Sequence, residues 1–153
     1  MTSAIDIPDL YSFELHFEDS AKIFLESDTG ASVFVSGSND DLITPRIEIS
    51  FDSIEAEAPN NLPEFTNHNA IFTTNILTDT FLEQPRTQHF DLVGKVRSSL
   101  LRGSANWNRS NLPFYDLKYI RQQSSFRESD GDFIRTEMNF EIKFAIREDA
   151  FPV

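Results

Sequence analysis

The clearest pattern in the chain is a nearly faultless alternation over residues 134–147, between side chains that suit a core and side chains that suit water. The core-facing set is Ile134, Thr136, Met138, Phe140, Ile142, Phe144 and Ile146. A period of two is typical of a β-strand with one buried and one exposed face. At about 3.3 Å per residue this strand would span roughly 45 Å, more than twice the usual length. We therefore expect it to reach past the core of its own domain and to serve assembly.

Four further segments follow strand patterns: residues 32–36, 46–58, 70–82 and 114–127. In residues 46–58 the alternation places Ile47, Ile49 and Phe51 on an inward face. Residues 70–82 are rich in Thr, Ile and Phe on both faces, which predicts a central strand or one that meets a partner. A turn over residues 128–132 is predicted to join the last two strands.

The first of two predicted helices covers residues 12–27. Its apolar positions recur at intervals of three and four, and they are Phe13, Phe17, Ala21 and Phe24. Ile23 and Leu25 widen this apolar stripe. Ser12 is the expected N-cap, and Gly30 is the expected terminator.

The second predicted helix covers residues 87–102. Its helical spacing is marked by Phe90, Val93, Val96 and Leu100. Pro85 is expected to close the preceding strand, and Gly103 to end the helix. Gly94 lowers helix propensity in the interior, so we expect it to permit close packing on the sheet.

Together these elements predict an α+β fold, a single domain over residues 1–153 in the order α-β-β-β-α-β-β. Two helices would pack on one face of a mixed or antiparallel sheet. Residues 1–10 form an N-terminal arm in this interpretation, with Ile5 and Ile7 available to dock on a neighbour, and residues 148–153 form a C-terminal tail. Residues 59–69 and 104–113 are expected to be loops.

The composition excludes several classes of protein. The chain has 153 residues, which suits one domain with a real core, and it has no cysteine, so disulfides and thiolate sites are excluded. No apolar run approaches the roughly 18 residues of a membrane span, and the first ten residues do not look like a signal peptide. We therefore expect no membrane association and no export by a leader.

The formal charge of −12 argues against nucleic-acid binding, which needs clustered Lys and Arg side chains. The charge is also divided unevenly along the chain. Residues 1–85 hold 16 acidic and 2 basic side chains, whereas residues 86–153 hold 9 acidic and 11 basic ones. If the two halves present different surfaces, copies could meet head to tail, as in a ring. The alternative is a solvated acidic face that aids solubility.

Candidate chemistry is sparse. His16, His68 and His89 lack the spacing of a metal site, and the sequence Asp130-Gly131-Asp132 fits a hairpin turn better than a calcium loop. Nucleophile-elbow, phosphate-loop and dinucleotide motifs are absent from the sequence. We therefore predict that the chain is not an enzyme and holds no metal or cofactor. Trp107 is either an anchor that faces a partner or a core residue.

Four segments together resemble the tail terminator (tail completion) proteins of tailed bacteriophages and related particles. They are TPRIEI at residues 44–49, FDLVGKVR at 90–97, NLPFY at 111–115 and MNFEIKFAIREDA at 138–150. The resemblance covers most of the chain as an order of elements, although its motifs are loose. It implies a small α/β subunit in a hexameric ring at the head-proximal end of the tail tube. Such a ring ends tube polymerisation and receives the head connector.

By this resemblance, the partners would be other copies of the chain, the tail tube protein and the head-tail connector, with DNA passing through the channel without specific binding. The protein would belong to the virion and assemble in the cytoplasm of a host bacterium. Candidate interface residues are Ile5, Ile7, Asp40, Asp41, Leu62, Phe65, Trp107, Asp130, Asp132 and Phe151. The chief alternative is another neck, connector or tail tube subunit. A third possibility is an unrelated acidic binding module or a small enzyme.

Overall fold

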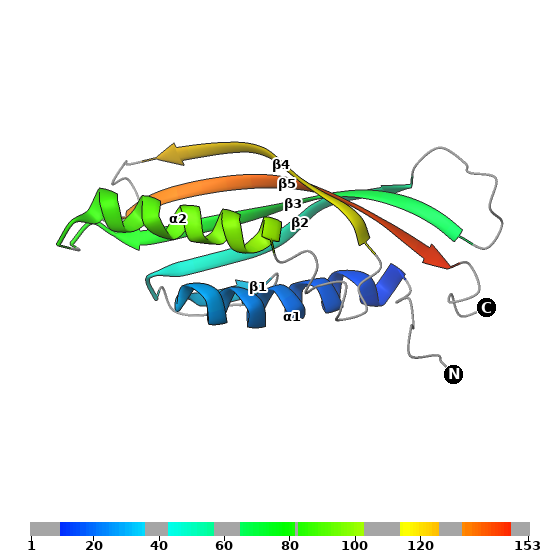
Figure 1. The fold of residues 1–153 in the computed structure, drawn as a ribbon, viewed down its shortest axis with the longest axis horizontal. Helices are drawn as coiled ribbons and strands as arrows, with labels where there is room; N and C mark the ends of the chain where they lie inside the picture. Colours follow the sequence, from blue (N-terminus) through cyan, green and yellow to red (C-terminus); the bar gives the residue numbers. More distant parts are fainter. Residues whose placement is uncertain are drawn as a thin grey trace.

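The computed structural model describes residues 10–35, 43–56, 65–81, 83–102, 114–125 and 133–147. Within them lie seven elements in the predicted order (Figure 1). They are α1 (Leu10–Thr29), β1 (Ser32–Val35), β2 (Arg46–Ala56), β3 (Phe65–Asp79), α2 (Pro85–Arg102), β4 (Phe114–Ser125) and β5 (Phe133–Arg147). The predicted α+β class and element order are confirmed.

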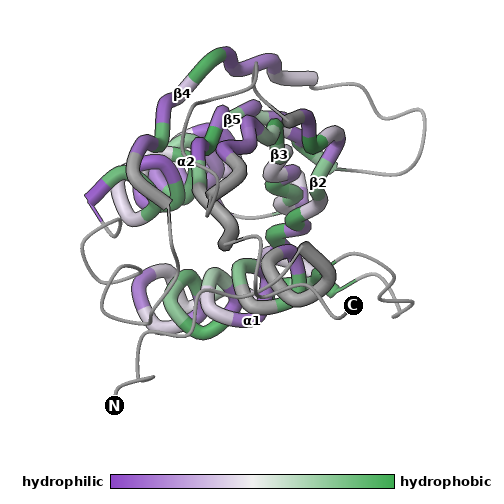
Figure 2. The backbone as a smooth tube through the Cα atoms, turned by 90° about the vertical axis from the view of Figure 1, so that its right-hand side faces the viewer, coloured by the Kyte–Doolittle hydropathy of each residue, from purple (hydrophilic) through white to green (hydrophobic). Residues whose placement is uncertain are grey.

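The five strands form one mixed sheet in the order β1-β2-β3-β5-β4. β1 pairs with β2 in parallel, and the other three pairings are antiparallel. Both helices contribute to a single hydrophobic core with one face of this sheet, as predicted. The view along the strands shows α1 below, β4 above, and β5, β3 and β2 between them (Figure 2).

The core-facing side of β5 matches the alternation in the sequence. Every member from Ile134 to Phe144 is at most 3% exposed; these members are Ile134, Thr136, Met138, Phe140, Ile142 and Phe144. Phe140 lies opposite Phe72 of β3, with ring centroids 5.1 Å apart, and Phe17 of α1 packs on Phe72 at 4.9 Å. Each buried phenyl ring contributes about 2–3 kcal/mol. This aromatic stack joins α1 to the centre of the sheet.

β3 is central, as predicted, but it begins earlier than the sequence suggested. The loop predicted over residues 59–69 is wrong from Phe65 onward, since β3 starts there and pairs with β5 along all 15 residues. Asn67 and Asn69 are only partly buried, whereas His68 is buried and stacks on Phe144, 5.3 Å away. The strand period is therefore present in this segment, but its polar side chains hide it.

The boundaries of α1 differ slightly from prediction. The helix begins at Leu10, so Ser12 lies inside it and is not the N-cap. Its end is as predicted: Gly30 adopts a φ of 75° and donates its N–H to the carbonyl of Glu26 at 3.0 Å. Glycine favours this left-handed conformation because it has no Cβ. Ile23 does not widen the buried stripe, because it is 72% exposed.

The predicted role of Pro85 is also wrong. Pro85 does not close β3, which ends at Asp79, but opens α2. Proline suits the first helical turn because the N–H it lacks would have no partner within the helix there. Nearby, the side chain of Gln88 accepts the backbone N–H of Gln84 at 3.1 Å. No helix in the described residues is long and apolar enough to span a membrane.

Candidate assembly interface

Nine of the ten predicted interface residues lie outside the described residues. They are Ile5, Ile7, Asp40, Asp41, Leu62, Trp107, Asp130, Asp132 and Phe151. The tenth, Phe65, is the first residue of β3 and pairs with Arg147 of β5. Their roles in an interface stay predictions, as do the arm, the tail and the turn at residues 128–132.

The uneven charge of the sequence corresponds to a division in space. α1, β1 and β2 together carry eight acidic and two basic side chains, whereas α2, β4 and β5 carry four acidic and nine basic ones. β1 and β2 form one side of the sheet, and β5 and β4 form the other. α1 and β4 lie on opposite sides of the molecule in both views (Figures 1 and 2). The described protein therefore has one acidic side and one basic side.

The solvent-facing side of α1 combines acid with exposed apolar side chains. Leu15 and Ile23 are 57% and 72% exposed, and they lie about two turns apart along the solvent-facing side of the helix. Exposed charged residues lie around them: Glu14, Asp19, Lys22 and Glu26. We call this set, from Glu14 to Glu26, the acidic helix face. Two exposed aliphatic side chains on one helix face are the kind of feature that a partner covers.

On the other side of the molecule, β4 forms an edge of the sheet. The register between β4 and β5 shifts at Ile120, and this residue is 47% exposed. Lys118 and Arg121 flank it and are both exposed. From α2, Arg97 donates to the side chain of Gln122 at 2.8 Å and lies over the Tyr119 ring. We call Arg97, Lys118, Ile120 and Arg121 the basic edge.

The two edges of the sheet differ in how they are protected. β1 is only four residues long, and the N–H of Val33 donates to the carboxylate of Glu26 at 3.3 Å. A short strand capped by a side chain offers little for another strand to pair with. β4 has 12 residues and no neighbouring strand on its outer side among the described residues. Its bulges and its cations discourage simple strand addition, so a contact here would use side chains.

The face of the sheet opposite the core is a polar surface with internal hydrogen bonds. Asn139 donates to the hydroxyl of Thr73 at 2.8 Å, and Thr73 donates to the carboxylate of Asp52 at 2.5 Å. Beside them, Asn69 donates to Glu141 at 3.1 Å. These groups largely satisfy one another across β2, β3 and β5, which makes this central part of the face a poor candidate for apolar docking.

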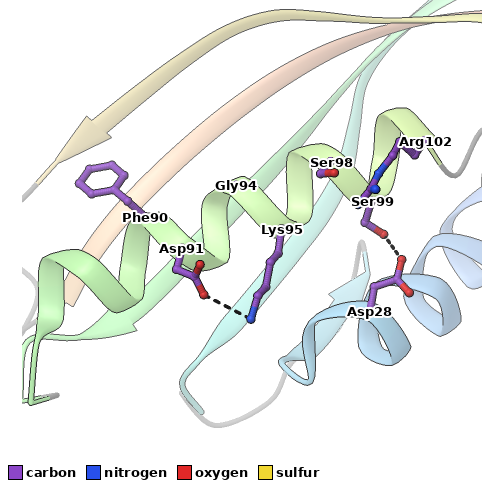
Figure 3. Close-up of a pocket in the computed structure, with 8 residues that line it drawn as sticks. All are labelled: Asp28, Phe90, Asp91, Gly94, Lys95, Ser98, Ser99 and Arg102. Atoms are coloured by element: carbon purple, nitrogen blue, oxygen red, sulfur yellow. Dashed lines mark hydrogen bonds and ion pairs between the residues drawn. The ribbon is translucent and has the colours of Figure 1, made fainter.

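A groove of about 480 Å³ runs along α2 beside the end of α1 (Figure 3). Its acids are paired: Asp28 accepts a hydrogen bond from Ser99, and Asp91 forms an ion pair with Lys95 at 3.2 Å. The expectation that Gly94 permits close packing on the sheet is wrong. Gly94 lines this groove, and a Cβ added there would meet nothing within 4 Å.

His89 lies in the core. Its ring nitrogens are each 2.7 Å from a hydroxyl, Nδ1 from Thr78 and Nε2 from Thr136, and Thr136 in turn lies 2.9 Å from the hydroxyl of Ser124. Burial lowers the pKa of His89 to about 4, because a charged ring would lose its hydration. No group of three or more potential metal ligands occurs among the described residues. His89 is therefore a neutral link between α2 and the sheet.

Comparisons with known proteins add little to this geometry. No protein-family model matches the chain, and no curated protein matches its sequence. Among solved structures, the chain is similar to a chain of the virion of a native gene transfer agent particle, with a TM-score of 0.44 and 10% identity. The match covers 86% of this chain and 92% of the other. At this distance, function has to be argued from the chain itself.

Proposed function

We propose that this chain is a structural virion protein that forms a ring, hexameric by its resemblance to tail terminators. The ring would cap the head-proximal end of a phage tail tube, end tube polymerisation and join the tail to the head connector. The observation that carries this proposal is the pair of oppositely charged surfaces on opposite sides of the subunit. A subunit with two different complementary surfaces associates head to tail, and such contacts give a ring when the rotation between copies closes.

The character of the two surfaces supports a structural role. Exposed aliphatic side chains lie among charges of mainly one sign on both surfaces: Leu15 and Ile23 on the acidic helix face, and Ile120 on the basic edge. Protein interfaces likewise combine apolar side chains with a polar rim. The buried histidine, by contrast, bonds to hydroxyl groups inside the core and lines neither groove nor surface. The polar chemistry of the described core thus holds the fold together.

The acidic balance of the chain suits a channel for DNA. Phosphate contacts from Lys and Arg bind DNA by releasing counterions, and they would retain the genome in the channel. An acidic lining lets DNA pass without specific binding. In this proposal the ring belongs to the neck of the virion and is assembled in the host cytoplasm, with the tube protein and the connector as its partners.

Negative-stain electron microscopy of the purified protein, with and without the tail tube protein of the same particle, tests the proposal. A tail terminator gives closed rings alone or at tube ends, and it shortens the tubes that grow in its presence. Unlimited tubes built from this chain would indicate a tube subunit instead. Rings that bind the connector but leave tube length unchanged would indicate another neck protein. A stable monomer with clear turnover in a hydrolase screen would refute the structural class.

A further inference from the structure

We propose that the acidic helix face of one copy docks on the basic edge of the next, and that this contact builds the ring. The inference rests on the proposed function for its closed geometry, but the contact itself is argued from charge, exposure and position. The occupant of each surface is a second copy of this chain.

The first step is position. The two surfaces lie on opposite sides of the subunit, with α1 at the bottom and β4 at the top of the cross-section in Figure 2. Joining the bottom of one copy to the top of the next repeats indefinitely or closes on itself.

The second step is charge. The basic edge presents Arg97, Lys118 and Arg121 against Asp116, which forms an ion pair with Lys118 at 3.6 Å, and the acidic helix face presents three acids against Lys22. Two basic edges brought together would repel each other, and so would two acidic helix faces. Complementary charge therefore favours the contact between unlike surfaces and selects against a two-fold symmetric dimer.

The third step is the apolar anchor on each side. Ile120 protrudes at a β-bulge between Lys118 and Arg121, and it is 47% exposed. Leu15 and Ile23 are spaced along α1 with Asp19 between them in the chain. An aliphatic side chain seated between two others excludes water from the surrounding ion pairs, which strengthens them. The cations on the edge of β4 discourage strand pairing, but in this way they can form ion pairs with the α1 helix of another copy.

Reversing the charges of each surface separately tests the contact. The first variant is Lys118→Glu with Arg121→Glu, and the second is Glu14→Lys with Asp19→Lys. In sedimentation-velocity experiments over a concentration series, each variant alone is expected to raise the dissociation constant of assembly at least about ten-fold. An equimolar mixture of the two variants is expected to assemble again, because each reversed surface then meets a complementary one.

A matched control carries two charge reversals outside both surfaces, at exposed positions: Arg102→Glu with Arg135→Glu. It changes the net charge as much as the first variant and is expected to change the dissociation constant less than about three-fold. Circular dichroism establishes that each variant is folded. If the α1 double variant unfolds, the single variant Asp19→Lys replaces it. In the mixing experiment this single variant is then combined with the single variant Lys118→Glu.

The outcomes separate this inference from the proposed function. Rings that form equally well in both variants refute the contact and leave the ring proposal standing. Variants that fail alone but assemble when mixed, with no effect on tube length, support the contact and refute the terminator role. A wild-type chain that remains monomeric at millimolar concentration refutes the contact, and so does a mixture that fails to assemble from folded variants.

Discussion

Lowering the pH from 7 to 5 should destabilise the fold through His89. The pKa of His89 is about 4 in the folded protein because burial disfavours the charged ring, against 6.5 for an unperturbed histidine. The unfolded chain therefore binds this proton more readily than the folded one does. The associated stability is fully present above pH 6.5 and is lost as the pH falls toward 4. From the two pKa values, the loss between pH 7 and pH 5 is about 2 kcal/mol.

Urea unfolding at several pH values, in the wild type and in His89→Gln, measures this effect. Carboxyl groups also titrate in the lower part of this range, so the quantity of interest is the difference in pH dependence between the two proteins. We expect the wild type to lose about 2 kcal/mol more than the variant between pH 7 and pH 5. Equal losses would show that the ring is not held neutral by the core. If the variant does not fold, NMR titration of the wild-type imidazole answers the same question, and a pKa above 6 would refute the reasoning.

Three further predictions follow from packing and charge. Gly94→Ala should stabilise the monomer by about 0.5–1 kcal/mol in thermal unfolding, because the added Cβ meets open space. Gly30→Ala should destabilise it by about 1 kcal/mol, because φ is 75° at this position. Effects of the same sign in the two variants would contradict this prediction. Phe72→Ala should cost about 3–5 kcal/mol in urea unfolding, since Phe72 contacts aromatic rings from α1, β2 and β5; a cost below about 1 kcal/mol would show that the stack is not tightly packed. Raising the salt from 0.15 M to 1 M should dissociate the assembled protein in sedimentation experiments, because the Debye length falls from about 8 Å to about 3 Å; assembly that persists unchanged would show that apolar contact dominates.

Much of the fold follows from the sequence because its apolar positions obey a clear period. In β5 the alternation alone identifies the residues that are buried, from Ile134 to Phe144. The start of β3 could not be found in this way, because Asn67, His68 and Asn69 are polar on both faces. Only the pairing with β5, a contact across more than 70 residues, shows that they form a strand. Local composition does not contain that information.

The helix patterns illustrate a second limit. Phe17, Ala21 and Leu25 recur every four residues and are fully buried, whereas Ile23 is apolar but points to solvent. From the sequence alone, Ile23 is assigned to a wider buried stripe of the helix, because hydrophobicity does not reveal which apolar residues the sheet can cover. The same ambiguity hid Leu15. An apolar residue off the main stripe of an otherwise regular amphipathic helix is the signal that could have identified this surface.

The candidate interface depends on strand order, which the sequence does not state. If β2 had paired with β4, the acidic side chains of the first half of the chain would have been mixed in space with the basic side chains of the second half. Instead β3 and β5 lie between them, so that the acidic first half and the basic second half remain on separate sides of one sheet. In the proposed ring each copy carries both signs on opposite sides, so every added copy would present a fresh surface of each kind. Growth would stop only when the rotation between copies closes the circle, and the angle between the acidic helix face and the basic edge would therefore set the number of subunits.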